Sequence, residues 1–262
     1  MDDRSVVTEV RGSAMWITLN RPEAMNAISP AMIEGVGRAL DEALGREDAR
    51  AVVLTGAGRA FSAGADLKYV RGETGSGEAG AGQFLNDLLA LLNRLERFPL
   101  PVIAAVNGLA LAGGLELVLC CDLVFAAKSA RFGDAHANYG LLPGGGGSVR
   151  LPRRIGAARA KYLMFTGEVV SAAVMEAAGL VNQAVEDGEL GHVVDALAAT
   201  IAAKSPLGVS RMKTLVNDGL EQPLEVALRQ ELVMSALHEH SDDVHEGLAA
   251  FQQKRAPHFI GR

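Results

Sequence analysis

Two glycine-rich turns constrain this chain more than any other feature of its sequence. They are Ser62-Ala63-Gly64-Ala65-Asp66 and Leu111-Ala112-Gly113-Gly114-Leu115-Glu116, and each follows an apolar run and opens a predicted helix. The runs at 51–55 and 101–106 lack polar alternation, which is typical of buried parallel strands. Small residues before a helix leave its first N–H groups accessible to an anion or a developing oxyanion. Since open α/β sheets bind ligands at strand carboxyl ends, we expect the two turns to form one two-donor site.

The composition excludes several classes of protein. With 262 residues and 49% hydrophobic content, the chain can bury a large core, which excludes a disordered or fibrous protein. The net charge of −6 offers no basic surface, so we expect neither a nucleic acid nor an anionic membrane as partner. The adjacent Cys120 and Cys121 fit neither an ordinary disulfide nor a metal site. Together with an N-terminus that lacks a signal-peptide pattern, they predict a reducing, cytoplasmic setting.

The apolar stretch 99–127 is the one segment that resembles a membrane helix. Asn107, Glu116 and Asp122 interrupt it, and its glycines break the helical pattern. A spanning helix needs roughly 20 uninterrupted apolar residues. The pattern therefore predicts a buried strand, a turn, a buried helix from Gly113 to Cys120 and another strand at 122–126.

The remaining pattern predicts a mixed α/β fold that becomes helical toward the C-terminus. Residues 5–10 and 14–19 predict a hairpin, and Ser29-Pro30 predicts the start of a helix that ends near Leu44. The glycine-rich segment 71–82 predicts a mobile loop that covers the first turn, followed by a helix at 83–97. From Ala157 onward we expect almost only helices, with new ones starting at Ser205-Pro206 and Gln222-Pro223.

Four motifs, in order, resemble the enoyl-CoA hydratase/isomerase (crotonase) superfamily across nearly the whole chain. They are Leu19-Asn20-Arg21-Pro22, Phe61-Ser62-Ala63-Gly64-Ala65-Asp66-Leu67, Val106-Asn107-Gly108 through Glu116, and Gly140-Leu141-Leu142-Pro143-Gly144-Gly145-Gly146-Gly147. The resemblance implies a spiral of β-β-α units in a core domain at 1–200. It also implies a C-terminal helical region at 201–262 that builds homotrimers, often paired into hexamers. The expected ligand is an acyl-CoA thioester, with no cofactor beyond the coenzyme A of the substrate.

By position, the resemblance places the family's oxyanion donors on the backbone N–H groups of Ala65 and Gly113. Reactions of this family pass through an anion on the thioester oxygen, and two fixed donors in a water-poor pocket stabilise that charge as it develops. The alternative is a pair of ordinary glycine turns that only start helices.

Glu116 is the first candidate for proton transfer. It lies in the first turn of a predicted buried helix, where an unpaired carboxylate would be costly. In hydratases of the family the matching glutamate belongs to a pair that handles the water and the proton at the α-carbon. The alternative is a carboxylate satisfied by helix N-terminal N–H groups.

His136 occupies the position at which the resemblance expects the second glutamate. Histidine titrates near neutrality, so a Glu116/His136 pair could still move protons, while a structural histidine remains an equal alternative. Asp134 either orients His136, caps the backbone or faces solvent.

Other residues are placed near the substrate by the resemblance or by charge. The predicted substrate-binding residues are Ala24, Ala63, Gly64, Asp66, Leu67, Lys68, Gly114, Pro143 and Gly144. Arg21 and Lys68 are candidates for the phosphates of coenzyme A, although exposed basic residues are usually only solvated. For Asp66, the first-turn carboxylate of a helix is the preferred interpretation. Phe251, Lys254, Arg255 and Phe259 form an aromatic and basic cluster that predicts a subunit interface.

The sequence favours addition of water to a 2,3-enoyl-CoA, with Glu116 as acid/base. Because His136 replaces a carboxylate, isomerisation, thioester hydrolysis or retro-Claisen cleavage remains an alternative. A non-catalytic or RNA-associated relative is a third interpretation. The acyl group is not determined by these residues, because selectivity depends on pocket shape.

Overall fold

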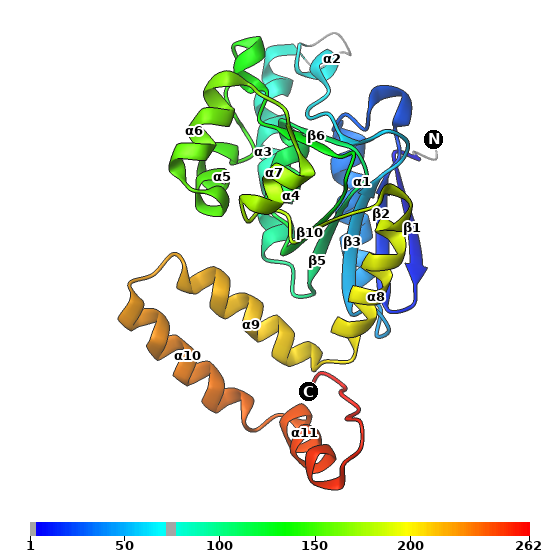
Figure 1. Cartoon of the computed structure of the whole chain (residues 1–262), viewed down its shortest axis with the longest axis vertical. Coiled ribbons are helices and arrows are strands. Elements are labelled where there is room, and N and C mark those ends of the chain that lie inside the picture. Colours follow the sequence, from blue (N-terminus) through cyan, green and yellow to red (C-terminus); the bar gives the residue numbers. More distant parts are fainter. Residues whose placement is uncertain (1–3, 72–76) are drawn as a thin grey trace.

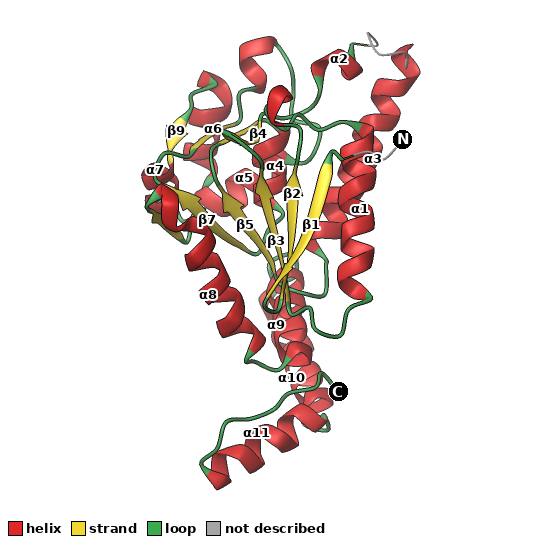
Figure 2. Ribbon diagram, turned by 90° about the vertical axis from the view of Figure 1, so that its right-hand side faces the viewer, coloured by secondary structure: helices red, strands yellow, loops and turns green. Residues whose placement is uncertain are grey.

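A largely parallel sheet built from the predicted apolar runs forms the centre of the fold (Figures 1 and 2). In the computed structural model, which describes residues 4–71 and 77–262, its strand order is β1-β2-β3-β5-β7-β10. The hairpin strands β1 and β2 pair antiparallel, and the other neighbours pair in parallel, as predicted for 51–55 and 101–106. The strands are β1 (Val6–Arg11), β2 (Ala14–Leu19), β3 (Ala51–Gly56), β5 (Val102–Val106), β7 (Leu123–Ala127) and β10 (Gln183–Val185).

Helices cover both faces of this sheet (Figure 2). Helix α8 (Leu190–Ala202) packs on one face, where Asp195 accepts a hydrogen bond of 3.0 Å from the indole of Trp16. Helices α1 (Pro30–Leu44) and α3 (Gly77–Glu96) lie on the other face. The predicted bounds of α1 are confirmed, because Ser29 Oγ accepts from the Met32 amide and Pro30 occupies the first turn.

A second, smaller sheet was not predicted, and its strands, not those of the large sheet, immediately precede the glycine-rich turns. Its strand order in the described part of the chain is β4-β6-β8-β9, and β4 pairs in parallel with β6. The two turns follow β4 and β6 directly, rather than the runs at 51–55 and 101–106. These strands are too short to give a periodic signal: β4 (Ala60–Ser62), β6 (Leu109–Leu111), β8 (Arg131–Gly133) and β9 (Val170–Ser171).

Helix α4 starts at the second turn and packs against the first strand of the small sheet. It spans Gly113–Leu119 and is buried throughout, close to the predicted range. A Cβ on Gly114 would lie only 2.1 Å from the carbonyl oxygen of Ser62. Glycine is therefore required at this position because backbone, rather than a movable side chain, occupies the space.

The predicted loop at 71–82 is wrong at its C-terminal end. Helix α3 already begins at Gly77, while residues 72–76 lie outside the described part of the chain. The glycines of this segment cost a helix only about 1 kcal/mol each. The buried side chains of Phe84 and Leu88 supply the packing that outweighs this cost.

The C-terminal helices extend away from the sheet (Figure 1). Helix α9 begins at Pro206 with Ser205 as its N-cap, as predicted, and α10 begins at Leu224 directly after Pro223. The short strands β9 and β10 interrupt the region that we expected to be almost wholly helical. The remaining helical elements are η1 (Pro22–Ala24), α2 (Leu67–Val70), η2 (His136–Tyr139), α5 (Gly147–Ile155), α6 (Ala157–Thr166), α7 (Ala172–Ala177), η3 (Asp187–Glu189), α9 (Pro206–Gly219), α10 (Leu224–His238) and α11 (Asp242–Gln253).

Among the described residues, no single helix is long and apolar enough to cross a membrane. The segments Asp187–Ala202 and Pro206–Gly219 meet the length and composition test only as a pair, with a bend of 104° between them. The apolar stretch at 99–127 instead forms β5, β6, α4 and β7, as its interruptions predict.

We predict that Gly114→Ala destabilises the protein. The added methyl group would contact the Ser62 carbonyl, and overpacking of this kind costs about 1–3 kcal/mol. Gly82→Ala is the matched control, because nothing lies within 4 Å of a Cβ at this position of α3 and alanine favours a helix. Urea unfolding of the two variants measures the difference, and equal stabilities would contradict the proposed contact.

Candidate active site

The two glycine-rich turns meet at the carboxyl ends of β4 and β6. A Cβ on Gly64 would lie 3.2 Å from the backbone nitrogen of Gly113, and a Cβ on Gly113 would lie 3.4 Å from that of Ala65. Side chains at either glycine would therefore fill the space around these amides. The sequence prediction that the two turns face each other is confirmed.

The backbone amides of Ala65 and Gly113 are available at this junction. Ile28 uses the neighbouring groups, since its amide donates to the Gly64 carbonyl at 2.8 Å and its carbonyl accepts from the Asp66 amide at 2.9 Å. Within the described residues, backbone hydrogen bonds outside helices and strands do not involve the amide of Ala65 or Gly113. These backbone hydrogen bonds therefore leave both amides available as donors to a ligand atom.

Ala112 holds the second turn in a strained conformation. Its φ of 47° and ψ of −118° are rare for a residue with a Cβ, and strain of this kind costs about 1–3 kcal/mol. The Ala112 amide donates to the Gly133 carbonyl at 2.9 Å, and its own carbonyl accepts from the Glu116 amide at 3.0 Å. These bonds fix the direction in which α4 leaves the turn.

Glu116 is a buried carboxylate held by backbone amides. Its side chain projects from α4, with 2% of the residue exposed, and its Oε1 accepts from the amides of Gly145 at 2.9 Å and Gly147 at 2.8 Å. Burial raises its pKa above the ordinary value, although the two amides and the charge of His136 oppose that shift. The predicted alternative of satisfaction by helix N-terminal amides is partly correct: Gly147 is the first residue of α5, not of α4, and Gly145 lies in the loop before that helix.

His136 and Asp134 form a second group beside Glu116. Asp134 is 2% exposed, and its Oδ1 lies 3.1 Å from Nδ1 of His136. Burial alone would lower the pKa of His136, but the hydrogen bond and charge of Asp134, together with Glu116, outweigh it and raise that pKa. Of the three predicted roles of Asp134, orientation of His136 is confirmed and exposure to solvent is wrong.

Gly147 lies close to both carboxylates, those of Glu116 and Asp134. A Cβ on this residue would lie 3.1 Å from Oε1 of Glu116 and 3.4 Å from Oδ2 of Asp134. Two carboxylates and one imidazole therefore gather around the first turn of α4, the helix that starts at Gly113. Together with the Ala65 and Gly113 amides, they form a set able to transfer protons and to stabilise an oxyanion.

Comparison with protein families decides where this arrangement belongs. A family model described as enoyl-CoA hydratase/isomerase matches residues 9–262. The chain belongs to the enoyl-CoA hydratase/isomerase family. Its mixed α/β core and C-terminal helical region are the crotonase fold that the four motifs imply.

Relatives of this family match over most of their length. The chain is 41% identical to the bovine "enoyl-CoA hydratase domain-containing protein 2, mitochondrial" over 252 residues, covering 94% of this chain and 83% of the relative. It is 39% identical over 267 residues to a "probable enoyl-CoA hydratase" of Rhodobacter capsulatus, with full coverage of both. The crystal structure of an enoyl-CoA hydratase from Bacillus anthracis superposes with a TM-score of 0.94 at 36% identity, covering 98% of this chain and 100% of that one.

The residues that the family resemblance assigns to substrate binding lie in different surroundings. Lys68 and Leu67 are exposed on α2, next to the first turn. Asp66 is the N-cap of α2, where its side chain accepts from the Lys68 amide at 3.1 Å, and it pairs with Arg21 at 3.0 Å. Its predicted role at the start of a helix is confirmed, but it precedes the first turn instead of lying within it. The charge of Arg21 is therefore already balanced within the chain.

The remaining substrate-binding candidates are small residues close to the two turns and to the glycine run at 144–147, whose amides bind Glu116. Gly114 is buried against Ser62, and a Cβ on Gly144 would lie 2.7 Å from the side chain of Leu85. Ala24, Ala63 and Pro143 are half-buried. Their assignment to substrate binding stays a prediction.

Sequence reasoning missed the amides of Gly145 and Gly147 as partners of Glu116. The four consecutive glycines at 144–147 were the available signal, but we used them only as part of a family motif, with Gly144 as a substrate-binding candidate. A buried carboxylate requires donors, and a glycine run before a helix supplies exposed amides.

We predict that Asp134→Asn lowers the pKa of His136. The substitution keeps the shape of the side chain but removes the carboxylate whose charge and hydrogen bond raise that pKa. An NMR titration of the imidazole resonances measures the change, with the exposed His192 as internal control. An unchanged or higher pKa of His136 in the variant would contradict the interaction.

Proposed function

We propose that this protein adds water across the 2,3 double bond of an enoyl-CoA thioester. The observations that carry the proposal are the meeting of the Ala65 and Gly113 amides at one junction and the burial of Glu116 in the first turn of α4, the helix that begins at Gly113. The names of its relatives, which are enoyl-CoA hydratases, agree with this activity.

The two amides would bind the thioester carbonyl oxygen. Attack of water at C3 pushes electrons through the conjugated system onto that oxygen, so negative charge develops where the donors are already fixed. Removal of one such donor typically costs a few kcal/mol of transition-state stabilisation. The role of the turns is therefore to stabilise the enolate.

Glu116 and His136 would divide the proton transfers. The Glu116 carboxylate accepts a proton from water as the C3–O bond forms, and the His136 imidazolium donates a proton to C2 of the enolate. Exchange with solvent then returns Glu116 to its carboxylate and His136 to its imidazolium form. Asp134 favours this assignment, because its carboxylate stabilises the charged imidazolium.

Thioester hydrolysis is the second candidate, and the His136–Asp134 pair favours it specifically. A histidine oriented by a buried carboxylate is a common arrangement for activating water. In that reaction water attacks the thioester carbonyl, the C–S bond breaks and free coenzyme A is released. The two candidates therefore differ in their products.

We further propose a homotrimer or a pair of trimers, located in the cytoplasm. The observation that supports assembly is the exposed apolar surface of the C-terminal helices, where Leu224 is 73% and Leu232 is 71% exposed. Apolar patches of this kind are typical of subunit interfaces. With these exposed fractions, the two leucines do not belong to the core of the protomer. Free, buried Cys120 and Cys121 suit a reducing compartment.

We predict that Glu116→Gln reduces hydration of crotonyl-CoA by about 10²–10⁴-fold in kcat, because the amide cannot accept the proton of water. The decrease in enoyl absorbance measures the reaction, and mass spectrometry separates 3-hydroxyacyl-CoA from free coenzyme A. Glu176→Gln, at an exposed position of α7, is the matched control. Turnover unaffected by Glu116→Gln would exclude this residue as the base.

We predict a bell-shaped pH dependence of kcat. On the acidic limb, activity rises as Glu116 deprotonates, and the midpoint of this limb lies above the ordinary glutamate pKa because burial raises the pKa of Glu116. On the alkaline limb, activity falls as His136 loses its proton, and the midpoint of this limb lies above the ordinary histidine pKa because Asp134 stabilises the imidazolium. His136→Gln should lower kcat and remove the alkaline limb. Loss of the acidic limb instead would assign His136 as the base.

A further inference from the structure

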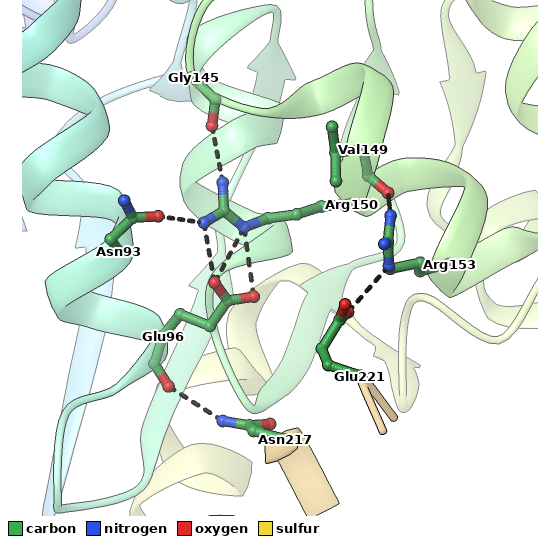
Figure 3. Close-up of polar contacts among 8 residues, drawn as sticks. All are labelled: Asn93, Glu96, Gly145, Val149, Arg150, Arg153, Asn217 and Glu221. Carbon is green, nitrogen blue, oxygen red and sulfur yellow. Dashed lines mark hydrogen bonds and ion pairs between the residues drawn. The ribbon is translucent and has the colours of Figure 1, made fainter. Parts of the chain in front are cut away.

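The side chain of Arg150 is hydrogen-bonded to Gly145, in the loop before α5 (Figure 3). It lies on α5, and its Nη1 donates to the carbonyl oxygen of Gly145 at 2.9 Å. The amide of that same glycine donates to Glu116 at 2.9 Å. Gly145 therefore connects the guanidinium to the catalytic carboxylate through one residue.

The guanidinium is fixed on its other edges by α3. Its Nε and Nη2 donate to the Glu96 carboxylate, with the shortest contact at 2.8 Å, and Nη2 also donates to Asn93 Oδ1 at 2.7 Å. Only 12% of the Arg150 side chain is exposed. The backbone carbonyl of Glu96 in turn accepts from Asn217 of α9 at 3.2 Å, which secures the end of α3 (Figure 3).

The loop is shaped to rest on this side chain. Gly146 has a φ of 96°, and a Cβ at that position would lie only 2.2 Å from Nη1 of Arg150. The guanidinium and the loop backbone therefore occupy adjoining space with no room for another side chain. Such a fork binds a carbonyl and a carboxylate at once, which the single ammonium of a lysine cannot match.

We propose that Arg150 is a positioning residue that, through Gly145, holds Glu116 in its reactive geometry. The inference rests on the proposed function for its kinetic consequence. Without the guanidinium, the loop loses its anchor, and the two amides no longer stabilise the Glu116 carboxylate at the present distances. A misplacement of about 1 Å in an active site can cost 100-fold in rate.

Arg150 also carries a charge, and the test must separate charge from geometry. The charged and titratable groups that face Glu116 are His136, Asp134, Arg150 and Cys120. Loss of the arginine charge alone would raise the pKa of Glu116. Arg150→Lys keeps the positive charge but loses the forked hydrogen-bonding geometry of the guanidinium. If only the charge matters, this variant should behave like the wild type, and if the geometry matters, it should behave like Arg150→Met.

The experiment compares Arg150→Met, Arg150→Lys and the control Arg153→Met. Arg153 lies on the same helix but pairs with Glu221 at 3.1 Å and is 54% exposed (Figure 3). We expect both Arg150 variants to lose about 10-fold or more in kcat with a smaller change in KM, and their acidic limb to move to higher pH. Arg153→Met should match the wild type.

A second measurement does not depend on activity. Carbon-13 NMR of protein labelled at the glutamate carboxyls, with Glu116→Gln used for assignment, follows the titration of Glu116 directly. We expect a higher pKa of Glu116 in both Arg150 variants. If the Arg150 variants show this higher pKa but the wild-type protein does not hydrate an enoyl-CoA, the proposed function is overturned and the positioning role of Arg150 is still supported.

Two results would overturn the inference. One is an Arg150→Lys protein with the kcat, pH profile and Glu116 titration of the wild type, which would reduce the role of Arg150 to charge. The other is an Arg150→Met protein with a lower melting temperature but an unchanged acidic limb and an unchanged Glu116 titration, which would make the role purely structural.

Discussion

The structure of the site depends on the burial of one carboxylate. Glu116 lies in a region where a charge without donors would be strongly unfavourable, and the amides of Gly145 and Gly147 supply those donors. Because both donors are backbone groups, the position of the carboxylate is set by the path of the chain between η2 and α5. Glycine suits position 145 because a Cβ there would lie 2.6 Å from Oε2 of Glu116.

The two glycine-rich turns use the same kind of close approach. Gly64 and Gly113 bring two segments of backbone together so that side chains do not block the amides, and Ala112 adopts a strained conformation at the junction. The hydrogen bonds of Ala112 with Gly133 and Glu116 hold this conformation. Small residues and distorted backbone are thus concentrated where a thioester would have to reach main-chain donors.

Much of the fold was predictable because long elements carry periodic signals. The hairpin, α1 and its cap, the parallel strands at 51–55 and 101–106, and α4 were found close to their observed positions. The strands of the small sheet were not, since three residues give too few positions for a pattern. The start of α3 was also missed, because glycines in its first turns conceal a helix whose stability comes from packing farther along the chain.

The sequence by itself determined the family and the residue types of the site, since the spacing of the glycine turns, Glu116 and His136 is a local property of the chain. It also indicated that a buried carboxylate and a histidine would share the chemistry. Only the tertiary structure decided which groups satisfy them: the Gly145 and Gly147 amides, the Asp134 carboxylate behind His136, and Arg150 behind the loop. The physical reason is that each of these partners depends on distances between segments, and no local pattern of apolar and polar residues encodes such distances.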